Sequence, residues 1–399
     1  MLEGKHIVLG ICGGIAAYKA AEIASRLRKK GADVHCIMTE NATKIITPLT
    51  LREITGNPVT VSMWSEVTHW NVEHIALASL ADAFVIAPAT ANILGKTANG
   101  IADDMLSTTI MATKTKVIFA PAMNSQMYTN PITQHNIEKL KQYGYVFIPP
   151  ASGHLACGTD GIGRLPEPEE IVDFVELEVG KTDRLKGCKV LVTAGGTQEP
   201  IDPVRYIGNR SSGTMGYAIA KAALLAGAEV ILVSAPTNLK PPAQAHLVKI
   251  GDAREMQAAA ESYFDDVDIV IKAAAVSDYR VSNPANQKIK KNEDTMDIVL
   301  QKNPDILYGL GQKKTHQILV GFAAETQNVI EYGFQKLKKK NLDMLVANDV
   351  SKAGAGFNVP TNIATLLFKD GHTEPLELMS KEELAAIIVE RAAEIRERK

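Results

Sequence analysis

Two glycine-containing turns have the residue types that bind anions. Gly10, Gly13 and Gly14 follow an apolar run near the N-terminus, and residues 202–216 (DPVRYIGNRSSGTMG) precede a helical pattern. Backbone N–H groups at the start of a helix can hold a phosphate, so each turn is a candidate cradle for a phosphorylated ligand. The alternative is a tight turn, or a helix capped by Ser or Thr, with no ligand.

Three further side chains of the first half could take part in a reaction. His74 lies in WNVEHI, Asn124 lies in PAMNSQM directly after an apolar segment, and Cys157 lies in ACGTDGIGR. Taken singly, such residues are more often structural: a packed histidine, a turn-forming asparagine or an inert core thiol. Cys157 sits among glycines rather than in an apolar run, which argues against simple core packing.

In this order, the three motifs resemble the flavin-dependent cysteine decarboxylases, specifically the phosphopantothenoylcysteine decarboxylase family, over about residues 4–175. The resemblance implies FMN as cofactor. Oxidation of the substrate thiol to a thioaldehyde lets the carbanion left by CO2 delocalise, and a flavin supplies that electron chemistry. His74 is then expected to be the base and Asn124 the clamp on the substrate carboxylate. The family assigns the final protonation to Cys157.

The expected FMN contacts end or follow the predicted strands of this half. They are Gly13, Gly14, Thr39, Thr90 and Ser107. In the family the flavin lies between the subunits of a trimer, so the resemblance implies a homo-oligomer. Related peptide-cysteine decarboxylases release the enethiol and need no proton donor, so Cys157 favours a saturated amine product.

From about residue 186 to the C-terminus, the chain resembles phosphopantothenate–cysteine ligase, and the tandem resembles the bifunctional bacterial enzyme. Amide formation needs an activated carboxylate, and the bacterial ligases use CTP to make an acyl-cytidylate that the cysteine amine attacks. This brings two anions together, so lysines and Mg²⁺ held with the CTP phosphates are needed. The resemblance implies that Lys288 stabilises phosphoryl transfer and that Asn209 polarises the acyl carbonyl.

The expected CTP site draws on several separate segments of the second half. Its members are Ala273, Ala274, Ala275, Asp278, Lys288, Asn303, Pro304, Asp305, Ile306, Phe322, Lys336 and Lys340. A lysine-rich run is more often a solvated face, so these roles depend on the resemblance. The family also implies a dimer of ligase domains. The substrates would be 4′-phosphopantothenate, cysteine and CTP.

The elements that must position these residues alternate between strand and helix. Residues 6–10 and 34–38 are predicted strands around a helix with apolar positions at helical spacing, ended by Gly31. Residues 83–87 and 117–120 are continuous apolar strands, typical of a parallel sheet covered on both faces. The same pattern restarts at residues 189–194, with a helix over about 215–225 and a strand over 227–233.

We therefore predict an α/β protein with two Rossmann-like domains. Residues 1–189 would form a flavodoxin-like FMN-binding decarboxylase domain, and residues 190–399 a CTP-dependent ligase domain with a mostly parallel sheet. Residues 180–184 are expected to be a linker and residues 281–295 a long loop. The last helix, over residues 381–398, is amphipathic and is expected to pack on the sheet.

The composition of the chain limits which binding partners and which cellular compartment we expect. The net charge of −2 gives no basic excess for nucleic-acid binding, and no apolar run reaches the ~20 residues that span a bilayer. The N-terminus lacks a signal-peptide pattern, so a cytoplasmic protein with reduced thiols is expected. The four cysteines form no Cys-x-x-Cys pair, so neither a zinc site nor a redox dithiol is indicated.

Two other functional classes are compatible with parts of the sequence. Rossmann-like openings in both halves could belong to an NAD-dependent reductase, but neither half has the complete Gly-x-Gly-x-x-Gly fingerprint. A flavin-binding regulatory protein would explain the first half alone. It would not explain a complete ligase half, nor Cys157 together with His74 and Asn124.

Overall fold

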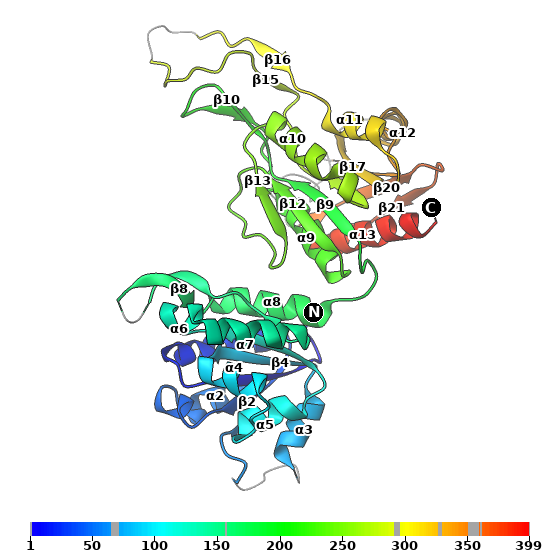
Figure 1. Ribbon diagram of the computed structural model, residues 1–399. Coiled ribbons are helices and arrows are strands. Elements are labelled where there is room, and N and C mark those ends of the chain that lie inside the picture. The colour runs from blue at the N-terminus through cyan, green and yellow to red at the C-terminus, as the bar shows by residue number, and fades with distance from the viewer. Residues whose placement is uncertain are drawn as a thin grey trace. The chain divides into compact units, whose positions relative to one another are not determined.

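A computed structural model describes residues 2–64, 72–155, 158–290, 296–325, 329–349, 359 and 361–398. The chain divides into two compact units, residues 1–180 and 181–399 (Figure 1). The domain boundary that we expected, at 189–190, is C-terminal to the boundary in the structure and falls at the start of strand β9. Residues 181–188 group with the second unit because the backbone N–H groups of Thr182 and Leu185 donate to Leu225 and Ala226, at 2.7 and 2.6 Å.

The first unit contains a six-stranded sheet in the order β3-β2-β1-β4-β5-β6. Every neighbouring pair is parallel, and the order reverses between β1 and β4, so the sheet is doubly wound. The strands are β1 (His6–Ile11), β2 (Asp33–Met38), β3 (Val59–Thr60), β4 (Ala83–Ala89), β5 (Lys116–Pro121) and β6 (Val146–Phe147). The prediction of a flavodoxin-like α/β unit is confirmed.

Helices cover this sheet because each presents an apolar face to it. Helix α1 buries Ala20, Ile23, Ala24 and Leu27, and Gly31 follows it with a φ of 90°, which favours glycine. The helices are α1 (Ala20–Lys29), α2 (Pro48–Thr55), α3 (Glu73–Leu80), α4 (Ala91–Ala98), α5 (Met105–Ala112), α6 (Ser125–Thr129), α7 (Pro131–Gln142) and α8 (Pro168–Gly180), with 3-10 turns η1 (Ile15–Lys19) and η2 (Ala42–Lys44). Strands β7 (Ala151–His154) and β8 (Asp160–Arg164) form an antiparallel pair.

The second unit contains an eight-stranded sheet in the order β13-β12-β9-β14-β17-β18-β20-β21. The pairs from β13 to β18 are parallel, whereas β20 and β21 pair antiparallel. The strands are β9 (Lys189–Ala194), β12 (Glu229–Ser234), β13 (His246–Lys249), β14 (Ile269–Lys272), β17 (Ile318–Glu325), β18 (Met344–Asp349), β20 (Ala364–Phe368) and β21 (Thr373–Pro375). The predicted mostly parallel sheet is confirmed.

Two strand pairs extend from this sheet as an arm. They are β10 (Gln198–Pro200) with β11 (Tyr206–Gly208), and β15 (Tyr279–Val281) with β16 (Leu300–Lys302) (Figure 1). The predicted loop 281–295 begins at the end of β15, and its residues 291–295 lie outside the described residues. A third short pair joins β19 (Thr361–Asn362) to β22 (Met379–Ser380).

The helices of the second unit complete its two outer layers. They are α9 (Thr214–Leu225), α10 (Ala253–Tyr263), α11 (Ile306–Lys313), α12 (Val329–Lys339) and α13 (Lys381–Glu397), with the 3-10 turn η3 (Phe264–Asp266). Helix α13 is the predicted last helix, and it packs on α9 and on β17. Among the described residues, no helix has the length and apolar character needed to cross a membrane.

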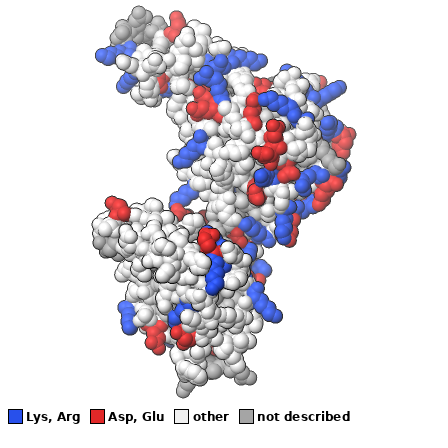
Figure 2. Space-filling view, viewed as in Figure 1, with Lys and Arg blue, Asp and Glu red and all other residues white. Residues whose placement is uncertain are grey.

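Charges of both signs are interspersed on the face of the second unit seen in Figure 2. The corresponding face of the first unit is largely uncharged in the same view.

Candidate functional site

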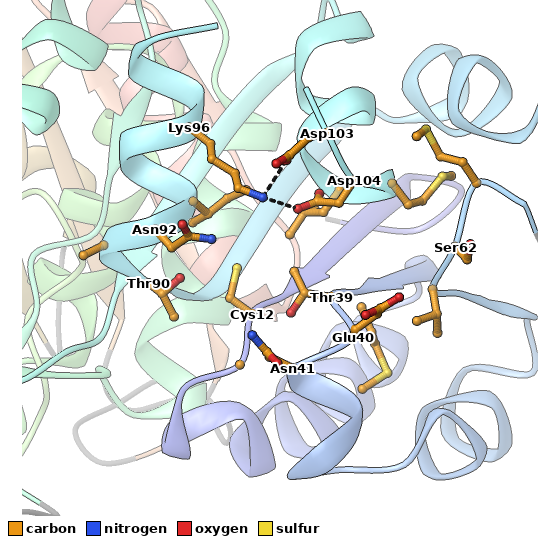
Figure 3. A pocket seen from close by; sticks show the side chains of 18 of the residues that line it. Cys12, Thr39, Glu40, Asn41, Ser62, Thr90, Asn92, Lys96, Asp103 and Asp104 are labelled. Carbon is orange, nitrogen blue, oxygen red and sulfur yellow. Dashed lines mark hydrogen bonds and ion pairs between the residues drawn. The ribbon is translucent and has the colours of Figure 1, made fainter. Parts of the chain in front are cut away.

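The first unit has a cavity of about 690 Å³ at the carboxyl ends of its central strands (Figure 3). Cys12 follows β1, Thr39 follows β2 and Thr90 follows β4, and all three line the cavity. The carboxyl ends of parallel strands share one edge of a sheet, which is where doubly wound folds bind nucleotides. The cavity also contains Gly13, so three of the five expected FMN contacts meet there.

The turn after β1 leaves no space for a side chain at Gly13. A Cβ on Gly13 would lie 2.4 Å from the Cβ of Asn41 and 2.8 Å from its carbonyl carbon. Gly14 lines a second cavity of about 520 Å³ instead, together with Asn124. The two glycines thus face two neighbouring cavities of the same unit.

A three-residue ionic group forms one wall of the first cavity. Lys96 Nζ lies 2.6 Å from Asp103 Oδ1 and 2.8 Å from Asp104 Oδ2 (Figure 3). Desolvation opposes the charge on Lys96, but the two carboxylates outweigh it and raise its pKa. Asp104 is the N-cap of helix α5 and forms a capping box with Ser107, which is not among the residues that line this cavity. Its hydroxyl supports the wall rather than facing the ligand space.

Cys12 is a cavity residue that we did not anticipate from the sequence. Burial raises the pKa of its thiol to about 12, although hydrogen bonding with Thr90 acts in the opposite direction. A thiol with this pKa stays protonated at neutral pH, so Cys12 shapes the cavity without acting as a nucleophile. Its position directly after β1 was the available sequence signal.

The three expected catalytic residues of this unit occupy different places. Asn124 is the N-cap of α6, where its Oδ1 accepts from Gln126 N at 2.9 Å, and it lines the second cavity. His74 lies in the first turn of α3 and lines neither cavity. Cys157 lies outside the described residues. Within the described part of one chain, His74 and Asn124 are not brought into one cavity.

The candidate nucleotide site of the second unit starts at the end of β14. Ala274 N donates to Thr193 Oγ1 at 3.2 Å, and Ala275 N donates to Gly195 O at 2.9 Å. These bonds hold Ala273–Ala275 against the glycine turn that follows β9. The expected alanine segment therefore lies at the carboxyl edge of this sheet.

Helix α11 brings a second group of expected residues to this edge. Asn303 N donates to Asp278 O at 2.8 Å, and Asp305 caps α11 by accepting from Tyr308 N at 3.1 Å. Lys340 Nζ lies 2.9 Å from Asp305 Oδ2 and lowers the pKa of that carboxyl against the effect of desolvation. The structure thus brings together Asp278, Asn303, Asp305 and Lys340.

Lys272 is the residue of this site that sequence analysis missed. It ends the otherwise apolar strand β14, beside Thr193 and Gly321 on the two neighbouring strands. Desolvation lowers its pKa to about 8, and the charge of Lys340 adds to that effect. Asp305 and Asp278 act on it in the opposite direction, which shows that this lysine belongs to the same electrostatic group. A lysine that directly follows three apolar strand residues was the sequence signal.

The remaining expected residues lie around this group. Asn209 packs against the glycine turn that follows β9: a Cβ on Gly196 would lie 3.0 Å from Asn209 O. Phe322 lies on β17 and Lys336 on α12. The exposed Lys288 lies on the arm, where its neighbour Ile289 donates through N to Asp202 Oδ2 at 3.2 Å. Among the described contacts, none joins Lys288 to the Asp305–Lys340 pair.

Comparison with known proteins agrees with this division into two units. Residues 1–180 match the family described as Flavoprotein, and residues 185–395 match the DNA/pantothenate metabolism flavoprotein C-terminal domain. The chain is 46% identical over 396 residues to the coenzyme A biosynthesis bifunctional protein CoaBC of Bacillus subtilis (strain 168), which covers 98% of each chain. The chain belongs to this bifunctional family.

Other members of the family are equally similar over their full length. The Haemophilus influenzae protein of the same name is 48% identical, covering 97% of both chains. The Escherichia coli (strain K12) protein is 45% identical, covering 98% of this chain and 97% of its own. The resemblance found in the sequence is confirmed, and the chain is a bifunctional coenzyme A biosynthesis protein with a flavoprotein unit and a ligase unit.

Proposed function

We propose that the chain couples cysteine to 4′-phosphopantothenate with CTP, and then decarboxylates 4′-phosphopantothenoylcysteine with FMN to give 4′-phosphopantetheine. The observation that carries this proposal is the pairing of two separate sites in a chain of the bifunctional family. One is a cavity at the carboxyl edge of a flavoprotein sheet, and the other is a group of lysines and carboxylates at the carboxyl edge of the second sheet.

The first cavity fits the binding of FMN. It follows three parallel strands, and the close packing of Gly13 against Asn41 keeps the turn after β1 compact beside the cavity. Thr39 and Thr90 offer hydroxyl groups at its rim, and Lys96 is already neutralised by two carboxylates. Backbone N–H groups and hydroxyls, rather than Lys96, would therefore hold the phosphate.

Bound flavin would take two electrons from the substrate thiol and return them later in the cycle. The chain's own residues would handle the carboxylate and the protons. His74 would accept the proton released at the cysteine end of the substrate, and Asn124 would orient the carboxylate through its amide. Cys157 would protonate the enethiol carbon as the product becomes saturated. These roles rest on the family resemblance.

In the second unit, MgCTP would bind against Ala273–Ala275 and the Asp305–Lys340 pair. The carboxylate of phosphopantothenate attacks the α-phosphorus, pyrophosphate leaves, and an acyl-cytidylate forms. Lys288 would stabilise the charge that develops on the phosphoryl oxygens, with Lys336 and Lys340 near the triphosphate. Asn209 would donate a hydrogen bond to the acyl oxygen when the cysteine amine displaces CMP.

Self-association would complete both sites. Exposed apolar side chains rim the two cavities of the first unit, a pattern that marks interaction surfaces. They are Ile15, Tyr18, Trp64 and Met127. His74 lines neither cavity within one chain, which supports a trimer in which a neighbour supplies it. The arm of the second unit likewise exposes apolar side chains that support a dimer: Val204, Tyr206, Tyr279, Val299 and Leu300.

The proposal is tested by incubating the full chain, loaded with FMN, with 4′-phosphopantothenate, cysteine, CTP and Mg²⁺. We expect CMP, CO2 and 4′-phosphopantetheine in equal amounts. Omission of CTP should abolish all three, whereas supplied 4′-phosphopantothenoylcysteine should restore CO2 release without CTP. Failure of a yellow, folded protein to release CO2 from that intermediate would overturn the decarboxylase half of the proposal.

A further inference from the structure

Two histidines and one aspartate meet at the amino end of the first sheet. His6 is the first residue of β1, and Asp33 is the first residue of β2 and lies opposite it in the parallel register. His35 is two residues further along β2, on the same face of the strand as Asp33. The FMN cavity follows the carboxyl ends of these strands, on the order of 17 Å away for a six-residue strand.

The two imidazoles converge on one carboxylate oxygen. His6 Nδ1 and His35 Nε2 each lie 3.1 Å from Asp33 Oδ2. The ligand atoms of the three residues all lie within 4.8 Å of one another. Metal–ligand bonds of about 2.05 Å place neighbouring ligand atoms about 3.3 Å apart in a tetrahedral site and about 2.9 Å apart in an octahedral one. The two observed N···O distances fall between these values.

A second layer of contacts fixes the carboxylate in this orientation. Asn57 Nδ2 donates to Asp33 Oδ1 at 2.7 Å and to Val34 O at 2.9 Å. Asp33 therefore offers Oδ1 to the amide and Oδ2 to both imidazoles. His35 is buried, with 9% of its surface exposed, so its ring is held in place. Hydrogen bonds that orient a ligating carboxylate are a regular feature of protein metal sites.

We propose that His6, Asp33 and His35 bind a divalent transition-metal ion such as Zn²⁺, with water in the remaining positions. Two imidazole nitrogens and one carboxylate oxygen suit ions of borderline softness, whereas Mg²⁺ and Ca²⁺ prefer sites made only of oxygen. This site is thus chemically distinct from the one that receives MgCTP. Bound metal would link the first residues of β1 and β2 and stabilise the folded first unit, because the unfolded chain lacks the assembled site.

The test is a zinc titration of the full chain in competition with a chromophoric chelator, combined with the visible absorption spectrum after Co²⁺ addition. We expect one site that is lost in His6→Gln and in His35→Gln. Loss of the orienting amide in Asn57→Ala should weaken it by roughly 10–100-fold. Zinc should also raise the apparent Tm of the first unit in the wild type and not in His6→Gln.

The matched control is His154→Gln. His154 Nδ1 lies 3.4 Å from Asp160 Oδ1, and among the described residues no second imidazole joins this carboxylate and imidazole. Zinc binding should be unchanged in this variant. Because His35 is buried, His35→Gln could lower stability, and the less buried His6 gives the cleaner variant. Equal zinc affinity in wild type and His6→Gln, or no chelator-competitive zinc in the wild type, would leave only a hydrogen-bonded cluster and overturn the proposal.

Discussion

Lys272 places a charge where the fold of the second unit disfavours it. Desolvation, with the charge of Lys340, lowers its pKa from 10.5 to about 8. Each pKa unit corresponds to about 1.36 kcal/mol, so the charged ammonium costs the folded state roughly 3 kcal/mol at neutral pH. Lys272→Met keeps the length and the apolar stem while removing the charge. We therefore expect this variant to be more stable than the wild type, by about 1–3 kcal/mol at pH 7.

The pH dependence of stability separates this cause from simple repacking. Below pH 8 both the folded and the unfolded chain hold the proton, so the full cost is present. Between pH 8 and 10.5 the unfolded chain binds more protons, so the free energy of unfolding of the wild type rises with pH. Lys272→Met should lack this rising limb. Its advantage over the wild type should disappear above pH 10.5.

The same substitution should weaken ligation, because one of the cations beside the proposed triphosphate site is lost. We expect a raised KM for CTP with unchanged CO2 release from supplied 4′-phosphopantothenoylcysteine. Both tryptophans, Trp64 and Trp70, belong to the first unit, so stability is best measured by hydrogen exchange of peptides from β14 and β17. Lys249→Met, at an exposed lysine that ends β13, is the control. A Lys272→Met variant that is destabilised at pH 7, or that keeps the wild-type KM for CTP, would refute this reasoning.

Three further substitutions probe individual residues. Gly13→Ala forces a Cβ to within 2.4 Å of Asn41, so we expect the free energy of unfolding to fall by about 1–3 kcal/mol. This variant should also retain less FMN, measured by visible absorbance of the flavin. The control, Gly95→Ala in α4, should retain FMN. Cys157→Ser should release CO2 but accumulate oxidised or enethiol product by mass spectrometry, because serine is a much weaker acid than a thiol. Asn209→Asp should release pyrophosphate without matching amide, because a carboxylate repels the developing oxyanion; equal loss of both half-reactions would indicate a binding defect instead.

The local sequence was sufficient to predict the strands and helix ends whose residue patterns follow directly from burial. The apolar runs of β1, β4 and β5 are buried in a parallel sheet, and Gly31 ends its helix with a positive φ, as their patterns predict. Lys272 and Cys12 were missed because their environments depend on neighbours that are distant in the chain. The pKa of Lys272 depends first on its burial and then on the charges of Lys340 and Asp305, which no spacing rule connects to β14.

The positions of His74 and Ser107 show a second limit of sequence reasoning. Both were expected at the flavin site from order along the chain. Ser107 instead completes the capping box of α5 with the N-cap Asp104, a role that depends on the local Asp-x-x-Ser spacing. His74 lies on α3 and lines neither described cavity, a placement that its order along the chain did not predict. Sequence motifs indicate which residues a family uses in its chemistry. They do not indicate where the fold places each of those residues.

If one chain carries two independent catalytic units, a pair of matched variants assayed for both activities should lose them separately. His74→Asn should abolish CO2 release from supplied 4′-phosphopantothenoylcysteine while CMP release with 4′-phosphopantothenate, cysteine and MgCTP stays at the wild-type rate. Lys288→Gln should show the reverse, because the exposed Lys288 lies on the arm of the second unit and His74 on α3 of the first. If either variant, folded and correctly assembled, lost both activities, the two sites would be coupled and the two units would not be independent.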